Sequence, residues 1–107
     1  MNSTANYLAD VLKSLAQPTR LKIIDFLRAG ERCVCEIFPA IDEEQSNTSR
    51  HLSYMQTHGI LSRRKDGVKI YYAVKHPEVF EIIDRGEGIV KREIEFRSGL
   101  IREMQRG

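Results

Sequence analysis

The sequence has no tryptophan, only two cysteines and no long apolar run, and each shortage narrows the class of protein. Four Phe and four Tyr leave a core that must be mostly aliphatic. Cys33 and Cys35 are too close in sequence to staple a fold, and in a cytosol they are expected to stay reduced. No apolar stretch approaches the roughly 18 residues of a membrane span, and the N-terminus lacks a signal-peptide pattern. We therefore expect a cytoplasmic chain with no membrane partner, forming one domain over residues 1–107.

Recognisable catalytic motifs are also missing. A cysteine-nucleophile hydrolase would need a base and an orienting group near one thiol, and nothing in the sequence places them there. No glycine-rich loop is present to cradle a phosphate group. We expect that the protein is not an enzyme.

The net charge of the chain is small, but basic residues are concentrated in one segment. The chain has 17 Lys and Arg against 15 Asp and Glu, a formal net charge of +2. Residues 45–75 hold six of the basic residues and only one acid, Asp66. An excess of basic residues in one segment is typical of a nucleic-acid-binding surface.

Apolar spacing predicts helices over most of the chain. The expected segments are residues 1–16, 18–29, 34–41, 43–58 and 77–105. Pro18 suits the first turn of the second helix, and Gly30 suits its C-terminal end. Asp42 and Gln45 have the spacing of a capping box for the fourth helix. Glycines in the last segment leave open whether it forms one long helix or two shorter ones.

Residues 60–64 and 68–74 are expected to form two strands of a hairpin. The turn is predicted at residues 65–67, because Asp66-Gly67 is a strong hairpin signal. Tyr71 and Tyr72 point to opposite strand faces, so at least one should lie in the core. The predicted fold is mainly α with a small β-hairpin, with about five helices and two strands.

The fourth predicted helix has one apolar and one polar face. Thr48, Leu52 and Met55 should face inward. The outer face should carry Gln45, Ser46, Asn47, Arg50 and Tyr54. Gln and Asn can bond adenine, and Arg can bond guanine, in the DNA major groove. We predict that these five residues contact DNA, and the alternative is an ordinary solvated helix face.

The hairpin carries four cations close to its turn: Arg63, Arg64, Lys65 and Lys69. They are predicted to reach DNA phosphates or an adjacent minor groove. The alternative is a charged edge that keeps an exposed strand soluble.

The three histidines have ordinary structural explanations. His51 lies between the two faces of the fourth helix, and a packed, hydrogen-bonded role is favoured there over a metal-ligand role. His58 lies in the last turn and suits a capping role. His76 precedes Pro77 and is expected to help start the last helix.

Several motifs together resemble the ArsR/SmtB family of winged helix-turn-helix repressors. They are residues 15–27 (LAQPTRLKIIDFL), 49–52 (SRHL), 58–61 (HGIL) and Gly67 with the Tyr71-Tyr72 pair. The resemblance covers about residues 12–74. It implies a winged helix-turn-helix domain with dimerisation helices at 1–16 and 77–105, a helix-turn-helix at 33–58 and a wing at 60–74. It also implies a homodimer that binds double-stranded DNA at an inverted-repeat operator and leaves it when an effector is sensed.

Cys33-Val34-Cys35-Glu36 resembles the Cys-Val-Cys-Asp box of arsenic- and cadmium-type family members. This chain departs from the pattern, because it has neither a third cysteine nearby nor one in the N-terminal segment. On a regular helix, residues i and i+2 lie about 200° apart, so the two thiols would diverge unless the first turn were distorted. The sequence thus leaves three readings open: a soft metal or metalloid ion at Cys33 and Cys35, thiol oxidation, or two structural cysteines.

A zinc site on the last predicted helix is not expected. That segment offers carboxylates, at Asp84, Glu87, Glu93 and Glu95, but no histidine. No cofactor is therefore assigned with certainty.

The leading prediction is a homodimeric, DNA-binding transcriptional repressor that is released by an effector sensed through the Cys-x-Cys pair. The alternatives are an effector-independent winged-helix regulator and a protein-interaction module, both with structural cysteines.

Overall fold

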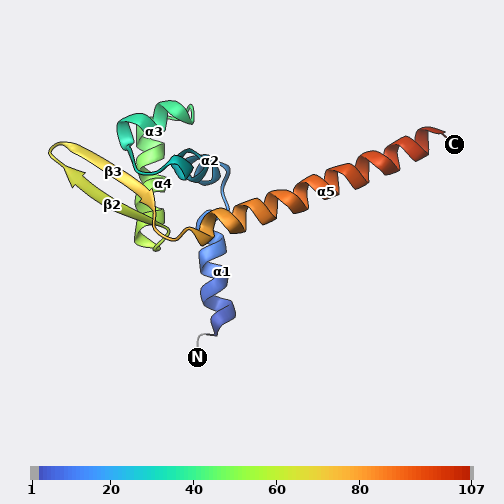
Figure 1. The fold of residues 1–107 in the computed structure, drawn as a ribbon, viewed down its shortest axis with the longest axis horizontal. Helices are drawn as coiled ribbons and strands as arrows, with labels where there is room; N and C mark the ends of the chain where they lie inside the picture. Colours follow the sequence, from blue (N-terminus) through green and yellow to red (C-terminus); the bar gives the residue numbers. More distant parts are fainter. Residues whose placement is uncertain (1–2, 107) are drawn as a thin grey trace.

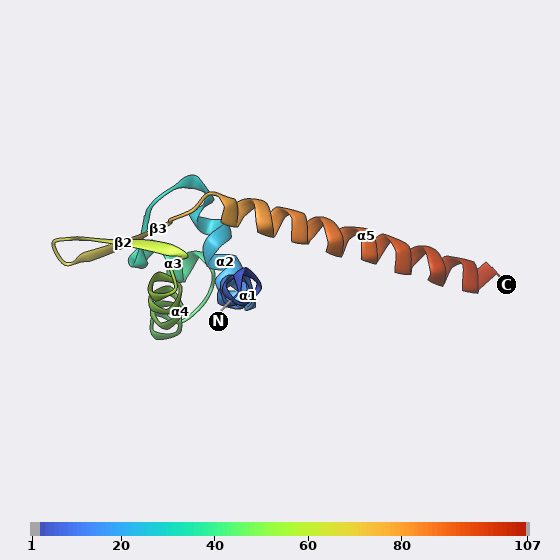
Figure 2. The same cartoon turned by 90° about the horizontal axis from the view of Figure 1, so that it is seen from below.

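The computed structural model describes residues 3–106 as a small helical body with two long projections. The elements in order are α1 (Thr4–Leu15), α2 (Pro18–Phe26), the 3-10 turn η1 (Leu27–Ala29), β1 (Arg32–Cys33), α3 (Val34–Ala40), α4 (Gln45–Thr57), β2 (Leu61–Asp66), β3 (Lys69–Val74) and α5 (Glu78–Arg106). The β2–β3 hairpin extends from one side of the body and α5 from the other (Figures 1 and 2). This is the predicted winged helix-turn-helix, and residues 1, 2 and 107 of the predicted domain lie outside the described part.

The sheet has three antiparallel strands in the order β1-β3-β2, one more than the sequence predicted. The extra strand β1 is only two residues long and pairs Arg32 with Tyr72. The hairpin turn was also predicted one residue too early. Asp66 pairs with Lys69, so the turn consists of Gly67 and Val68, and Gly67 takes the positive φ of 62° that glycine accommodates without strain.

The capping box predicted at Asp42 and Gln45 is wrong. Asp42 adopts a left-handed conformation with φ 56°, and the residue before α4 is Glu44, whose side chain makes no capping bond. A capping box does form at the start of α3. There the Cys33 sulfur accepts from the backbone N–H of Cys35, and the Glu36 carboxylate accepts from the backbone N–H of Cys33 at 3.1 Å.

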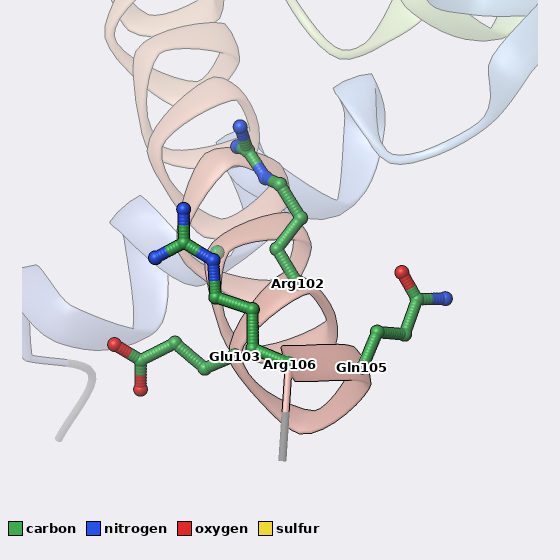
Figure 3. Close-up of a pocket in the computed structure, with 5 residues that line it drawn as sticks. Arg102, Glu103, Gln105 and Arg106 are labelled. Atoms are coloured by element: carbon green, nitrogen blue, oxygen red, sulfur yellow. The ribbon is translucent and has the colours of Figure 1, made fainter.

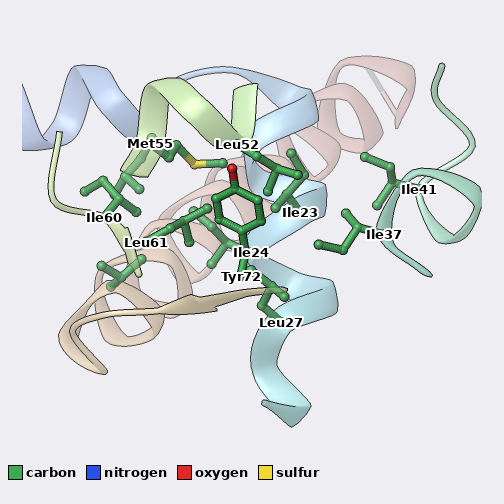
Figure 4. Packing of buried hydrophobic residues seen from close by; sticks show 12 residues of the cluster. Ile23, Ile24, Leu27, Ile37, Ile41, Leu52, Met55, Ile60, Leu61 and Tyr72 are labelled. Atoms are coloured by element: carbon green, nitrogen blue, oxygen red, sulfur yellow. The ribbon is translucent and has the colours of Figure 1, made fainter. Parts of the chain in front are cut away.

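One aliphatic core joins the helices to the base of the wing. Its buried members are Leu15, Ile23, Ile24, Leu27, Ile37, Ile41, Leu52, Met55, Ile60, Leu61, Tyr72 and Val79. The Tyr72 ring lies among Ile24, Leu52 and Met55, so the wing is anchored to α2 and α4 (Figure 4). Tyr71, on the other strand face, is only half-buried, as the alternation of a strand predicts.

The last predicted segment is a single helix, α5, of 29 residues. Its glycines do not break it, because Gly86, Gly88 and Gly99 lack the positive φ seen at the turn glycines. Most of its apolar side chains are exposed, up to 80% at Met104. Among residues 3–106, no helix combines the length and apolarity needed to cross a membrane.

Candidate nucleic-acid interface

Helix α4 presents the polar face that its sequence predicts. Thr48, Leu52 and Met55 are fully buried. Gln45, Ser46 and Arg50 are exposed, Asn47 is half-buried, and Tyr54 is 37% exposed. The N-terminal half of α4 therefore offers amide, hydroxyl and guanidinium groups to solvent at the end where recognition helices contact base edges.

Two of these polar side chains are linked to each other and to an acid. Arg50 donates from Nη2 to Asn47 Oδ1 at 2.8 Å, and Asn47 donates from Nδ2 to Glu43 Oε2 at 3.3 Å. Glu43 is in turn 3.9 Å from Lys22 Nζ on α2. These hydrogen bonds hold the side chains of the predicted contact residues in place in the absence of DNA. The sequence predicted Glu43 only as an acid suited to the N-terminus of this helix and did not predict its bond to Asn47, four residues later.

Tyr54 differs from the other predicted contact residues because both faces of its ring are covered. The Arg20 guanidinium lies 3.9 Å from the ring centroid. The His58 imidazole stacks on the ring with centroids 4.0 Å apart. His58 Nδ1 also lies 2.8 Å from the Tyr54 carbonyl oxygen at the end of α4, which supports its predicted capping role.

His51 is hydrogen-bonded to Arg20. The Arg20 Nε–H donates to His51 Nδ1 at 3.1 Å, so this nitrogen is unprotonated. Burial lowers the pKa of His51 below its ordinary value, and the positive charges of Arg20 and Arg50 lower it further. The packed, hydrogen-bonded interpretation is thus the one that the structure favours over a metal ligand.

The register of the hairpin divides the four predicted wing cations between two faces. Arg63 lies opposite Tyr72, whose side chain enters the core, so Arg63 and Lys65 share the face that packs toward the helices. Arg64 lies opposite Tyr71 on the other face, together with Lys69. Only Arg63 and Lys65 therefore lie on the same side of the wing as α4.

Arg64 is already engaged by an acid that the sequence analysis missed. Its Nη2 lies 2.6 Å from Glu31 Oε1, and its guanidinium also lies 4.6 Å from the Tyr71 ring centroid. A second carboxylate, Asp66, is 3.8 Å away. The Arg64 hydrogen bond lowers the pKa of Glu31, and the same bond raises the pKa of Arg64. Arg64 is therefore less available to phosphates than Arg63 or Lys65.

The sulfur atoms of Cys33 and Cys35 lie at disulfide distance, so the two side chains do not diverge as they would on a regular helix. Their Cα atoms are 5.1 Å apart. The reason is that Cys33 is not helical: it is the residue before α3, with φ −70° and ψ 146°, at the end of β1. Cys33 is buried and Cys35 is exposed. The pair therefore lies where the wing sheet joins the helix-turn-helix.

Two further features of residues 3–106 concern metal binding and surface hollows. No group of three or more His, Cys, Asp or Glu residues in this range could hold a metal ion. A hollow near the end of α5 is lined by Arg102, Glu103, Gln105 and Arg106 (Figure 3). These side chains come from a single helix and do not converge on a common point, so the hollow has no geometry for catalysis.

Known proteins resemble this chain in both sequence and structure. The family described as bacterial regulatory protein, arsR family, matches residues 17–63, from the start of α2 into β2. The arsenical resistance operon repressor of Staphylococcus aureus is 33% identical over 76 residues, covering 71% of this chain and 73% of that protein. The chain belongs to the arsR family of bacterial regulatory proteins.

Two further relatives bear on the interpretation of this arsR-family chain. The arsenic resistance transcriptional regulator ArsR1 of Pseudomonas putida is 41% identical over 75 residues, covering 69% of this chain but only 58% of that relative. A solved domain from Mycobacterium bovis, described as a homodimeric winged helix-turn-helix DNA-binding domain, has a TM-score of 0.74 and 27% identity. It is covered to 84%, and this chain to 85%.

Proposed function

We propose that this arsR-family chain is a homodimeric transcriptional repressor that binds duplex DNA through α4 and the wing. One observation carries the proposal: α4 exposes a polar N-terminal half, and Arg63 and Lys65 lie on the sheet face that packs toward the helices. Neither cation has an ion-pair partner within residues 3–106. The Staphylococcus relative is described as a repressor and the Mycobacterium bovis domain as DNA-binding, and both descriptions support the proposal.

The contacts divide by chemistry. Gln45, Ser46, Asn47 and Arg50 would read base edges in the major groove, with amides suited to adenine and Arg50 to guanine. Arg63 and Lys65 would contact phosphates or the neighbouring minor groove, which adds affinity without sequence information.

Dimerisation would use α1 and α5. Tyr7 and Leu8 on α1 are 61% and 51% exposed, and the distal half of α5 exposes Ile94, Phe96 and Ile101 to similar degrees. An apolar groove of about 340 Å³ lies between α1, α2 and α5. Contiguous apolar surface of this kind marks an interaction site. A two-fold dimer presents two recognition helices, which calls for an inverted-repeat operator.

DNA binding is tested by gel shift of the chain with its own promoter at graded salt concentrations. The expected result is affinity that falls steeply as salt rises, as phosphate contacts require. It should also fall on Arg50→Ala and Arg63→Ala substitution. A shallow salt dependence together with no effect of either substitution would refute the proposal.

For the effector we propose that Cys33 and Cys35 form the sensing site. The ArsR1 and Staphylococcus relatives are named for arsenic resistance, and another relative, from Listeria innocua, is named for cadmium resistance. Two thiolates match the ligand preference of soft ions, but residues 3–106 supply no third ligand for a closed site. In this structure the two sulfurs lie at disulfide distance, so reduction of the pair, or capture of an ion by the two thiolates, would alter the start of α3 and its junction with β1.

The sensing proposal is tested by titrating the DNA complex with arsenite, cadmium, zinc or an oxidant. DNA release by one agent from the wild type, but not from the Cys33→Ser/Cys35→Ser variant, is expected. If no agent releases the wild type, the cysteines are structural. The chain would then be an effector-independent regulator, or a protein-interaction module if DNA binding fails as well.

A further inference from the structure

Arg20 is a charged side chain buried between helices without an acidic partner. It is 7% exposed, and no carboxylate within residues 3–106 pairs with it. A buried cation is costly unless hydrogen bonds and oriented dipoles replace its water shell. Its surroundings must therefore compensate the charge, and they come from two different helices.

The first set of partners is the C-terminal end of α1. Arg20 Nη1 lies 3.3 Å from the Ser14 carbonyl oxygen and 3.5 Å from that of Lys13, and it donates to both. These carbonyls belong to the last turn of α1, where the helix dipole carries partial negative charge. The guanidinium thus stabilises the end of α1 at the point where the chain turns into α2.

The second set is the middle of the recognition helix α4. Arg20 Nε donates to His51 Nδ1 at 3.1 Å, and its guanidinium covers the Tyr54 ring at 3.9 Å. His51 and Tyr54 are one turn or less apart, and both lie beside Arg50, the predicted guanine-reading residue. The rigid, planar guanidinium of Arg20 therefore bonds α1 through Nη1 and α4 through Nε.

We propose that Arg20 is a positioning residue that ties the recognition helix to α1, so that sequence-specific DNA binding depends on where α1 lies. The inference rests on the proposed function, in which α4 reads DNA and α1 lies in the dimer interface. A change in subunit arrangement that moves the end of α1 would be transmitted to α4 through this side chain in addition to the direct packing of the two helices. Arg20 would act through His51 and Tyr54 and would not need to touch DNA.

The test compares Arg20→Lys with the matched control Arg28→Lys in the full-length chain. Lysine keeps the charge but cannot bond both helices with a planar fork. Arg28 pairs with Asp25 and Asp84, away from α4.

Affinities for the promoter duplex and for a scrambled duplex are measured by fluorescence anisotropy, with circular dichroism and dimer mass as folding controls. We expect Arg20→Lys to weaken promoter binding by about tenfold to a hundredfold, the worth of one or two charged hydrogen bonds. Scrambled-duplex binding and the salt slope should not change, and Arg28→Lys should resemble the wild type.

A second measurement needs no folded variant. The ¹⁵N chemical shifts of His51 in the wild type should show an unprotonated Nδ1 and a protonated Nε2, because Nδ1 accepts from Arg20. A protonated Nδ1 at neutral pH would overturn the link itself. An unchanged promoter-to-scrambled affinity ratio in Arg20→Lys would overturn the positioning role, as would equal losses on both duplexes with a reduced salt slope, which would mark a direct phosphate contact. Failure of the wild type to bind any duplex would instead refute the proposed function, and the ¹⁵N shifts would still decide whether the link exists.

Discussion

Arg63 and Arg64 are adjacent on β2 but should differ sharply in their contribution to DNA binding. Arg63 is exposed on the α4 side of the wing and has no ion-pair partner among residues 3–106. Arg64 points to the other face and is held by Glu31 at 2.6 Å and by Asp66 at 3.8 Å. We predict that Arg63→Ala removes a phosphate contact and that Arg64→Ala does not.

The magnitude follows from counterion release. Each phosphate contact contributes about 0.9 to the slope of log affinity against log salt concentration. Losing one contact should lower that slope by about 0.9. The fold loss of DNA affinity between roughly 50 and 200 mM salt should then be about threefold smaller for the variant than for the wild type. Arg64→Ala should leave the slope unchanged within error, because its charge is already neutralised by Glu31. Its effect on stability should also be small, since the ion pair is exposed.

The assay is a salt titration of promoter binding by anisotropy for the wild type and both alanine variants, with thermal unfolding as the folding control. Equal slope reductions in the two variants would show that the register of the hairpin does not decide which cations meet DNA. A slope reduction in Arg64→Ala alone would reverse the assignment of the two wing faces. Either result would refute the reasoning.

Two further predictions concern stability. Folding lowers the pKa of His51 from its unfolded value of about 6.5. Below that pH the unfolded chain therefore binds a proton at His51 more readily than the folded chain does. The free energy of unfolding should therefore decrease as pH falls from about 6.5 through the folded pKa. Urea unfolding at pH 7.5 and 5.5 checks this, and a pH dependence in His51→Gln as large as in the wild type would contradict it. Thr48→Val should leave stability unchanged or raise it by about 1 kcal/mol. The Thr48 hydroxyl is buried without a hydrogen-bond partner among the described residues. A loss above about 1 kcal/mol in thermal unfolding would show instead that this hydroxyl makes a stabilising bond.

Local patterns in the sequence predicted the helices and the reading face well. The burial of Thr48, Leu52 and Met55 and the exposure of Gln45 and Ser46 follow from helical periodicity alone, because residues three and four apart share a face whatever the helix packs against. The predicted end of the fourth helix at residue 58 also holds, because Gly59 follows it and takes the φ of 80° that glycine accommodates without strain. The continuity of α5 was not, because glycine lowers helix propensity without forbidding a helix.

The missed features depend on neighbours that are distant in sequence or on the backbone conformation of one residue. Strand β1 forms because Arg32 pairs with Tyr72 of β3, which lies forty residues later in the sequence. The thiols meet because Cys33 takes an extended conformation before α3, and the sequence named such a distortion only as the condition for their meeting. The hairpin turn was misplaced by one residue, and in a strand such a shift decides the face of every side chain.

The sequence by itself determined the family, the order of the helices and the hairpin, and the basic character of residues 45–75, because motifs and periodicity are properties of neighbouring residues. It also determined that Gln45, Ser46, Asn47 and Arg50 share the polar face of one helix. Only the tertiary structure decided which wing cations stay free, since that depends on the partner of each β2 residue in β3 and on Glu31, thirty-three residues before Arg64. It likewise showed that Arg20 joins α1 to α4, because a single side chain can connect two helices only after all three elements have packed.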